Sequence, residues 1–267
     1  MNNRIDTCFA RLAAEKKKAL VTFMTAGTPS LAATEKIVLE MLENGADIVE
    51  IGVPFSDPIA EGSVIQAASL DALARGTTLD GIFAIVKSLR TKTDAPLLLM
   101  MYVNTIFVYG TEKFFALCKK NGVDGVIVPD LPYEERDELL PTAEKYDVRN
   151  INLVSPTSEN RIAEISANSR GFLYCVSSLG VTGERSAFST DFDRFFDNIK
   201  THVACPACVG FGISSPEQAR RMAGYCDGVI VGSAVVRTAR ECRDGDFSPV
   251  GALVKTLRNA LDTSDCR

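Results

Sequence analysis

Short runs of hydrophobic residues recur along the chain, and each is followed by a stretch whose apolar positions have helical spacing. The runs begin near Ala19, Ala46, Pro96, Val123, Arg149, Gly171, Cys205 and Asp227. A run such as DIVEIGV or GVIVP is apolar on both faces, which is typical of strands buried in a parallel sheet. After the first run, Ile37, Met41 and Leu42 recur at helical spacing. Strands that alternate with helices predict parallel pairing, because parallel neighbours need a crossover connection.

Eight such units in 267 residues predict an α/β fold, a single-domain (β/α)8 TIM barrel over residues 1–267. An open doubly wound sheet is the alternative, but no Gly-x-Gly-x-x-Gly motif opens any of the helices. Extra helices are expected after the second strand, around Ile65–Ala74, and after the eighth strand. A further helix, expected to close the bottom of the barrel, is indicated by the spacing of Ile5, Cys8, Phe9 and Leu12.

Two of the connections that follow strands are unusually long. The second strand is followed by the loop Gly52–Glu61, and the sixth by the loop Ser177–Ser189, which contains Gly180 and Gly183. In barrels, the loops after the strands form the catalytic face, and long ordered loops are usually functional. The sequence therefore places a functional site near these two loops.

Composition narrows the chemistry. The chain has one His, His202, so a His-rich metal site cannot be built within it, and a Ser-His-Asp triad would have to use that residue. Cys205 and Cys208 form a Cys-x-x-Cys pair, but no second pair lies at zinc spacing. We therefore expect buried thiols and no metal. With 29 basic and 34 acidic residues, the net charge of −5 argues against a nucleic-acid partner.

No segment is expected to cross a membrane. The longest uncharged stretch, Ala95–Thr111, is shorter than a typical span and contains Asn104 and Gly110. The N-terminus does not have the pattern of a signal peptide, and eight scattered Cys are typical of a reducing compartment. A cytoplasmic location is therefore expected.

Glycines at the ends of three consecutive predicted strands indicate a phosphate site. Gly180 and Gly183 follow the sixth strand, Gly212 follows the seventh, and Gly232 follows the eighth, just before Ser233. Glycine lets backbone N–H groups approach an anion closely, and a helix that begins at Ser233 would favour phosphate at its N-terminus. Any one of these turns alone would indicate no more than a tight turn.

Carboxylates and phenols near the same strand ends are the candidate acids and bases. Glu50 lies near the end of an otherwise apolar strand, where burial should raise its pKa toward neutrality and suit it to acid–base catalysis. A structural ion pair is the alternative for Glu50. Glu61 and Asp57 lie in the following loop, and Tyr102 and Tyr174 end the third and sixth strands. These residues alone predict a small phosphorylated substrate and carboxylate chemistry, with the substrate left open.

The segment Val49–Gly62, VEIGVPFSDPIAEG, closely resembles the signature of the tryptophan synthase alpha subunit family. The resemblance covers nearly the whole chain. Further matching motifs, in order, are Phe23–Gly27, Met101–Asn104, Gly180–Gly183, Gly210–Pro216 and Gly232–Ser233. The long second-loop motif is highly specific, whereas other phosphate-binding barrels share the glycine turns.

The resemblance implies retro-aldol cleavage of indole-3-glycerol phosphate to indole and glyceraldehyde 3-phosphate. By position, Glu50 would act as acid and base at indole C3 and the side-chain hydroxyl, and Glu61 would accept a hydrogen bond or proton from the indole N–H. The implied indole pocket comprises Phe23, Met100, Tyr102, Tyr174 and Thr182. The implied phosphate ligands are Gly183, Gly212, Gly232 and Ser233.

The resemblance also implies a beta subunit partner in an alpha2-beta2 complex. The beta subunit would carry pyridoxal phosphate, so no cofactor is expected on this chain. The implied partner face lies at the catalytic end of the barrel and includes Pro54, Asp57, Asn104, Phe107 and Pro132.

The chain departs from the family pattern beside the second carboxylate. Glu61 stands where Asp is expected, and Ser63 follows Gly62 where Pro is expected. Catalytic geometry must hold to about half an ångström, so these changes leave open a catalytically weak subunit that chiefly activates the beta subunit. A separate alternative is a stand-alone lyase that releases indole without a partner.

Overall fold

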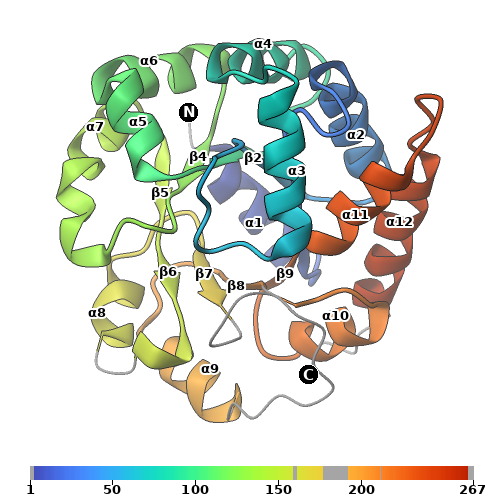
Figure 1. The fold of residues 1–267 in the computed structure, drawn as a ribbon. Coiled ribbons are helices and arrows are strands. Elements are labelled where there is room, and N and C mark those ends of the chain that lie inside the picture. The colour runs from blue at the N-terminus through green and yellow to red at the C-terminus, as the bar shows by residue number, and fades with distance from the viewer. Residues whose placement is uncertain (1–2, 159–160, 177–191, 211, 264–267) are drawn as a thin grey trace.

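The computed structural model describes residues 3–158, 161–176, 192–210 and 212–263. Within these residues, nine parallel strands form one sheet that curls into a barrel with helices around it (Figure 1). The strands are β1 (Ala19–Thr25), β2 (Ile48–Gly52), β3 (Leu97–Met100), β4 (Gly125–Ile127), β5 (Arg149–Ile151), β6 (Leu153–Val154), β7 (Leu173–Val176), β8 (Ala207–Gly210) and β9 (Gly228–Val231). Their order in the sheet is β5-β4-β3-β2-β1-β9-β8-β7-β6. The predicted TIM barrel is confirmed.

The helices connect consecutive strands on the outside of the barrel or lie at its ends. They are α1 (Arg4–Ala14), α2 (Leu31–Glu43), α3 (Ser63–Ala74), α4 (Leu79–Leu89), α5 (Val103–Tyr109), α6 (Thr111–Asn121), α7 (Leu140–Lys145), α8 (Ile162–Ala167), α9 (Phe192–His202), α10 (Pro216–Ala223), α11 (Ser233–Glu241) and α12 (Ser248–Asp262), with the 3-10 turns η1 (Tyr133–Glu138) and η2 (Pro156–Ser158). The extra helices expected after the second and eighth strands are present as α3 and α12. No described helix is long and apolar enough to cross a membrane.

The eight predicted runs become nine strands because the fifth run is divided at Asn152. β5 pairs with β4, and β6 pairs with β7. The carbonyl of Asn152 itself accepts a hydrogen bond of 2.9 Å from the Tyr174 N–H. The run thus leaves one neighbour and joins the other, which brings the two ends of the sheet together.

Alternation along each strand sends side chains to two separate cores. In β2, Ile48 belongs to the cluster inside the barrel, whereas Val49 and Ile51 belong to the cluster between the strands and the outer helices. Since side chains alternate along a strand, Glu50 shares the inward face with Ile48. The register places Glu50 between Phe23 of β1 and Leu98 of β3. A carboxyl group therefore lies within the barrel.

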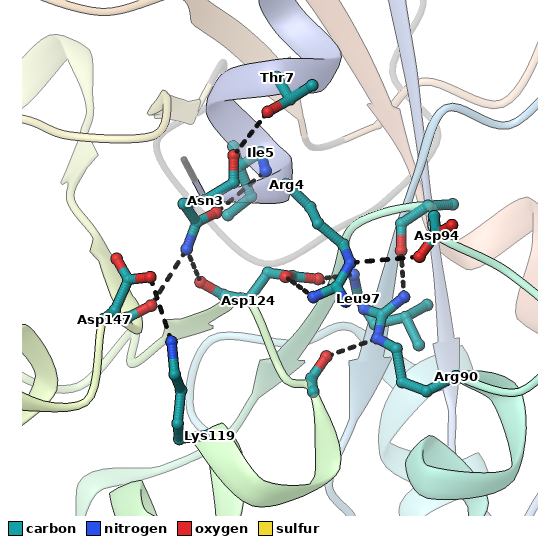
Figure 2. Close-up of polar contacts among 12 residues, drawn as sticks. Asn3, Arg4, Ile5, Thr7, Arg90, Asp94, Leu97, Lys119, Asp124 and Asp147 are labelled. Atoms are coloured by element: carbon teal, nitrogen blue, oxygen red, sulfur yellow. Dashed lines mark hydrogen bonds and ion pairs between the residues drawn. The ribbon is translucent and has the colours of Figure 1, made fainter. Parts of the chain in front are cut away.

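The N-terminal helix α1 closes the end of the barrel opposite the loops that follow the strands. Its apolar face, Ile5, Phe9 and Leu12, is buried in the interior cluster, as its spacing predicts. Asn3 caps the helix, since its side-chain oxygen accepts from the Ile5 N–H at 3.0 Å, while its amide donates to the carbonyl of Asp124 at 2.9 Å. Figure 2 shows Asn3 between α1 and Asp124.

Asp124 joins α1 to the start of β3 and the end of α4. Its carboxylate accepts from Arg4 at 3.1 Å, from Arg90 at 2.5 Å and from the Leu97 N–H at 2.9 Å (Figure 2). The Asp124 side chain is only 4% exposed and that of Arg90 only 10%. A buried pair of this kind is costly to break from one side, because the remaining charge loses its partner.

Asp124→Asn is expected to lower the free energy of unfolding by about 3 kcal/mol, because it leaves the Arg90 charge buried against a neutral amide. Urea denaturation followed by circular dichroism measures the change. The matched control is Asp94→Asn, since Asp94 pairs with Arg4 at 3.7 Å but its side chain is 97% exposed. The control should change stability by no more than about 0.5 kcal/mol. Equal effects of the two substitutions would contradict a buried structural role for Asp124.

Candidate active site

A cavity of about 250 Å³ opens at the carboxyl ends of the strands. Its described lining residues come from β1, β2, β3, β7 and β9 and from the segments that follow β2, β8 and β9: Phe23, Glu50, Glu61, Ser63, Val64, Ile65, Met100, Tyr174, Gly212, Ile213, Ser214, Ile230, Gly232, Ser233 and Arg237. These segments are far apart in sequence, and they meet here because all the parallel strands of a barrel end at the same face. The cavity lies where the second-loop motif predicts a site.

Glu50 is the most unusual group in the cavity. Its side chain is fully buried, and neither carboxyl oxygen has a hydrogen-bond partner among the described residues. Burial raises the pKa of Glu50 from 4.5 to about 8. The carboxyl group is therefore protonated at neutral pH, which removes the cost of an isolated buried charge. The structural ion pair considered from the sequence is not formed among the described residues, and Glu50 is ready to give a proton to a ligand.

Glu61 is held differently, by Tyr102. The Tyr102 hydroxyl donates to the Glu61 carboxylate, and its oxygen accepts from the N–H groups of Ile59 at 2.7 Å and Ala60 at 2.9 Å. Burial raises the pKa of Glu61, and the hydrogen bond from Tyr102 opposes that shift. One phenol at the end of β3 thus fixes both the carboxylate and the backbone of the loop that carries it.

Three of the five residues expected to form an indole pocket line the cavity, namely Phe23, Met100 and Tyr174. The Phe23 ring passes so close to Gly52 that a Cβ there would lie 2.5 Å from Phe23 Cζ, so any larger residue at this strand end would displace the ring from the cavity wall. Tyr102 is not among the described lining residues, because its ring stacks on Phe55 behind Glu61, with ring centroids 4.7 Å apart. The fifth residue, Thr182, lies outside the described residues.

Gly212, Gly232 and Ser233 line the cavity from the segments that follow β8 and β9. Gly212 has a φ of +78°, a left-handed conformation that glycine adopts readily. Ser233 begins α11, and no side chain caps that helix among the described residues. An uncapped helix start exposes N–H donors and partial positive charge, which favours an anion. Gly183, also expected here, lies outside the described residues.

Several lining residues were missed by the sequence analysis. Ile65 and Ile230 add apolar surface, and Ser214 adds a hydroxyl. Arg237 adds a positive charge one helical turn after Ser233. Its spacing of four from Ser233 was a usable signal, since residues four apart lie on the same face of a helix.

The expected partner residues lie at this same end of the barrel, in the segments that follow β2, β3 and β4. Asp57, Asn104 and Pro132 are exposed, and Phe107 is 46% exposed, whereas Pro54 is buried. Two further apolar side chains are exposed here and were not singled out from the sequence: Ile59, at 74%, and Val108, at 81%. Exposed apolar groups near one another in the fold favour an interaction surface.

A larger hollow of about 1090 Å³ lies at the other end, beside α1. Many of its charged groups are paired with one another, as in Arg4–Asp124, Lys119–Asp147 and Arg11–Asp47. Among its described lining residues it has no buried carboxyl group without a hydrogen-bond partner, which Glu50 provides in the smaller cavity. Within the described part of the chain, no cluster of His, Cys, Asp or Glu is arranged to hold a metal, and Cys205 and Cys208 are free thiols.

Comparison with known proteins gives one consistent family. A sequence profile described as "Tryptophan synthase alpha chain" matches residues 9–261. The tryptophan synthase alpha chain of Thermoanaerobacter pseudethanolicus is 48% identical, and the match covers 97% of this chain and 100% of that one. The fold also matches tryptophan synthase subunit alpha from Legionella pneumophila, with a TM-score of 0.88, 34% identity and coverage of 98% and 99%. A tryptophan synthase structure from Mycobacterium tuberculosis matches with a TM-score of 0.89, 32% identity and the same coverage.

Proposed function

The chain belongs to the tryptophan synthase alpha chain family, and we propose that the cavity containing Glu50 is where it cleaves indole-3-glycerol phosphate. The enzyme is a carbon–carbon lyase that releases indole and glyceraldehyde 3-phosphate, the alpha reaction of L-tryptophan biosynthesis. One observation carries the assignment of the site. Among the described residues, the fully buried Glu50 carboxyl group has no hydrogen-bond partner, and it faces a cavity that also contains the start of α11, which no described side chain caps.

Glu50 supplies the proton that begins the reaction. With its pKa raised to about 8, it is protonated at neutral pH and donates to indole C3. Protonated at C3, the ring becomes an indolenine that can accept electrons. The Glu50 carboxylate left behind then takes the proton of the adjacent side-chain hydroxyl. As the aldehyde forms, the carbon–carbon bond breaks and its electron pair returns to the indole ring, so Glu50 recovers its proton.

Glu61 acts on the other side of the indole ring. Its carboxylate accepts a hydrogen bond or the proton from the indole N–H, which favours addition of a proton at C3. A proton taken by Glu61 returns to the indole nitrogen as the carbon–carbon bond breaks, so that neutral indole leaves and the carboxylate is restored. Tyr102 positions this carboxylate through the hydrogen bond between their side chains. Because Glu is one methylene longer than the expected Asp, the support from Tyr102 and from the loop amides sets how far the carboxylate reaches into the cavity.

The two ends of the substrate bind to different kinds of groups in the cavity, the indole ring to apolar side chains and the phosphate to hydrogen-bond donors. Phe23, Met100 and Tyr174 offer apolar and aromatic surface to the indole ring. Gly212, Gly232 and Ser233 offer backbone N–H groups and a hydroxyl to the phosphate. Thr182 and Gly183 are assigned to the same pocket by the family motif alone.

The partner of the chain is the tryptophan synthase beta subunit, and pyridoxal phosphate is the cofactor of that subunit. The partner face proposed on this chain comprises the segments around Asp57, Asn104, Phe107 and Pro132, with Pro54 beneath them and the exposed Ile59 and Val108 beside them. Both subunits of an alpha2-beta2 complex would work in the cytoplasm, as the sequence analysis expects.

A paired assay tests the proposed function. The purified chain is mixed with the beta subunit, and two reactions are followed: consumption of indole-3-glycerol phosphate and formation of tryptophan from indole and serine. We expect the chain to cleave indole-3-glycerol phosphate into indole and glyceraldehyde 3-phosphate, and to do so faster with the beta subunit present. Cleavage at the same rate without the partner would favour a stand-alone lyase. Stimulation of the indole-plus-serine reaction without any cleavage would contradict the proposal.

A further inference from the structure

The cavity contains an uneven distribution of charge. Among its described lining residues, Glu50 and Glu61 are acidic, and Arg237 is the one residue with a positive charge. A phosphate monoester carries about −1.5 to −2 charges at neutral pH. Its binding beside a carboxylate needs a compensating positive charge close to the phosphate. Backbone N–H groups supply part of that charge, and they do so as dipoles.

Arg237 is placed to supply the rest. It lies in α11 four residues after Ser233, so the two residues are on the same face, one turn apart. Side chains of an α-helix lean toward its N-terminus, so a residue covers the turn that precedes it. The Arg237 side chain is therefore directed along α11 toward the uncapped helix start, and it reaches the cavity there.

We propose that the Arg237 guanidinium binds the phosphate group of the substrate together with the N-terminus of α11. The inference rests on the proposed function and extends it, because it adds a charged side chain to a phosphate site otherwise made of backbone groups and the Ser233 hydroxyl. A second observation at the same cavity points to a ligand independently of the helix, namely the fully buried Glu50 carboxyl group, which has no hydrogen-bond partner in the described part of the chain. The guanidinium suits the task because its planar donors match phosphate oxygens in pairs.

Arg240 provides a matched control on the same helix. It lies three residues after Arg237 and is not among the lining residues of the cavity. Its guanidinium instead pairs with Asp71 of α3 at 2.7 Å. Arg240→Gln therefore removes the same charge from α11 without touching the proposed phosphate site.

The experiment compares Arg237→Gln, Arg237→Lys and Arg240→Gln with the unchanged chain, each in complex with the beta subunit. Four quantities are measured: kcat and KM for indole-3-glycerol phosphate, the Kd of glycerol 3-phosphate, and the Kd of indole, which has no phosphate. Arg237→Gln is expected to raise KM and the Kd of glycerol 3-phosphate about tenfold, the scale of one charge-assisted hydrogen bond at an exposed site. The KM and Kd values of Arg237→Lys should lie between those of Arg237→Gln and the unchanged chain. The kcat and the indole Kd of both Arg237 variants should stay within about twofold of the unchanged chain. All four quantities should also stay within about twofold in Arg240→Gln, which is the scale of an ordinary surface substitution.

Salt dependence gives a second readout that loss of packing alone would not produce. The Kd of glycerol 3-phosphate should rise with ionic strength more steeply in the unchanged chain than in Arg237→Gln, because salt screens an exposed guanidinium. An unchanged Kd for glycerol 3-phosphate in Arg237→Gln would overturn the inference. An equal rise in the Kd of indole in that variant would overturn it too. Failure of the unchanged chain to cleave indole-3-glycerol phosphate would instead overturn the proposed function, while the glycerol 3-phosphate comparison would still decide the role of Arg237.

Discussion

Replacing Glu50 by Gln is expected to lower kcat for cleavage of indole-3-glycerol phosphate by about 10²- to 10⁴-fold, the usual contribution of a general acid or base. Gln has almost the same shape as a protonated Glu but has no proton to give to indole C3 and no carboxylate to accept the hydroxyl proton. The loss should therefore fall on kcat and leave the KM nearly unchanged. Steady-state assays with the beta subunit present measure it, and full activity of Glu50→Gln would contradict the assignment.

The stability of Glu50→Gln supplies the control for this prediction. The folded chain keeps the Glu50 proton up to about pH 8, whereas an unfolded chain releases it near 4.5. Between these values the folded state binds more protons than the unfolded state, so this group makes stability fall as pH rises. Gln does not titrate, so the variant should lack this part of the pH dependence. We expect Glu50→Gln to be at least as stable as the unchanged chain at pH 8, which separates lost chemistry from lost folding.

Glu61→Ala is expected to lower kcat/KM by about 100-fold, because the indole N–H loses a charged acceptor just as the ring takes up a proton. Glu61→Asp should lose much less, since it keeps the charge and has the side chain expected for the family. Glu61→Gln, which keeps the length and removes the charge, should behave like Glu61→Ala. The same steady-state assay distinguishes the three variants.

Two results would contradict this role of Glu61. Equal losses in Glu61→Ala and Glu61→Asp would mean that the charge is not what the position contributes. An active Glu61→Gln would mean that hydrogen bonding through a neutral group is sufficient. In either case the hydrogen bond from Tyr102 would be a means of fixing the loop rather than of positioning a catalytic group.

The barrel was accessible from sequence because buried parallel strands leave a strong pattern. Runs such as GVIVP are apolar on both faces only where helices cover one face and the barrel interior lies on the other. The division of one run at Asn152 was not accessible, because it depends on which neighbour each half meets when the ring closes. The second helix between β3 and β4 was also missed, since α5 and α6 are separated only by Gly110.

The site was predicted unevenly for a similar reason. Glu50 could be recognised because a charged residue in an apolar strand is costly unless it serves a function, and alternation along β2 sets its direction. The hydrogen bond between Tyr102 and Glu61 could not be predicted from sequence. It depends on the path of the loop, which brings the N–H groups of Ile59 and Ala60 to the Tyr102 hydroxyl. For Arg237, the spacing of four from Ser233 indicates a shared helix face, but whether that face meets the cavity depends on the rotation of α11 about its axis.

The proposed reaction depends on the barrel interior keeping the Glu50 carboxyl group protonated at neutral pH, so that it can act first as an acid. The direct measurement is the pKa of Glu50, read from the side-chain carboxyl signal in a pH series of 13C NMR spectra and assigned by its absence in Glu50→Gln. We predict that the Glu50 carboxyl group is protonated at pH 7 and titrates near pH 8. Titration near the ordinary value of 4.5, with a carboxylate at pH 7, would contradict it.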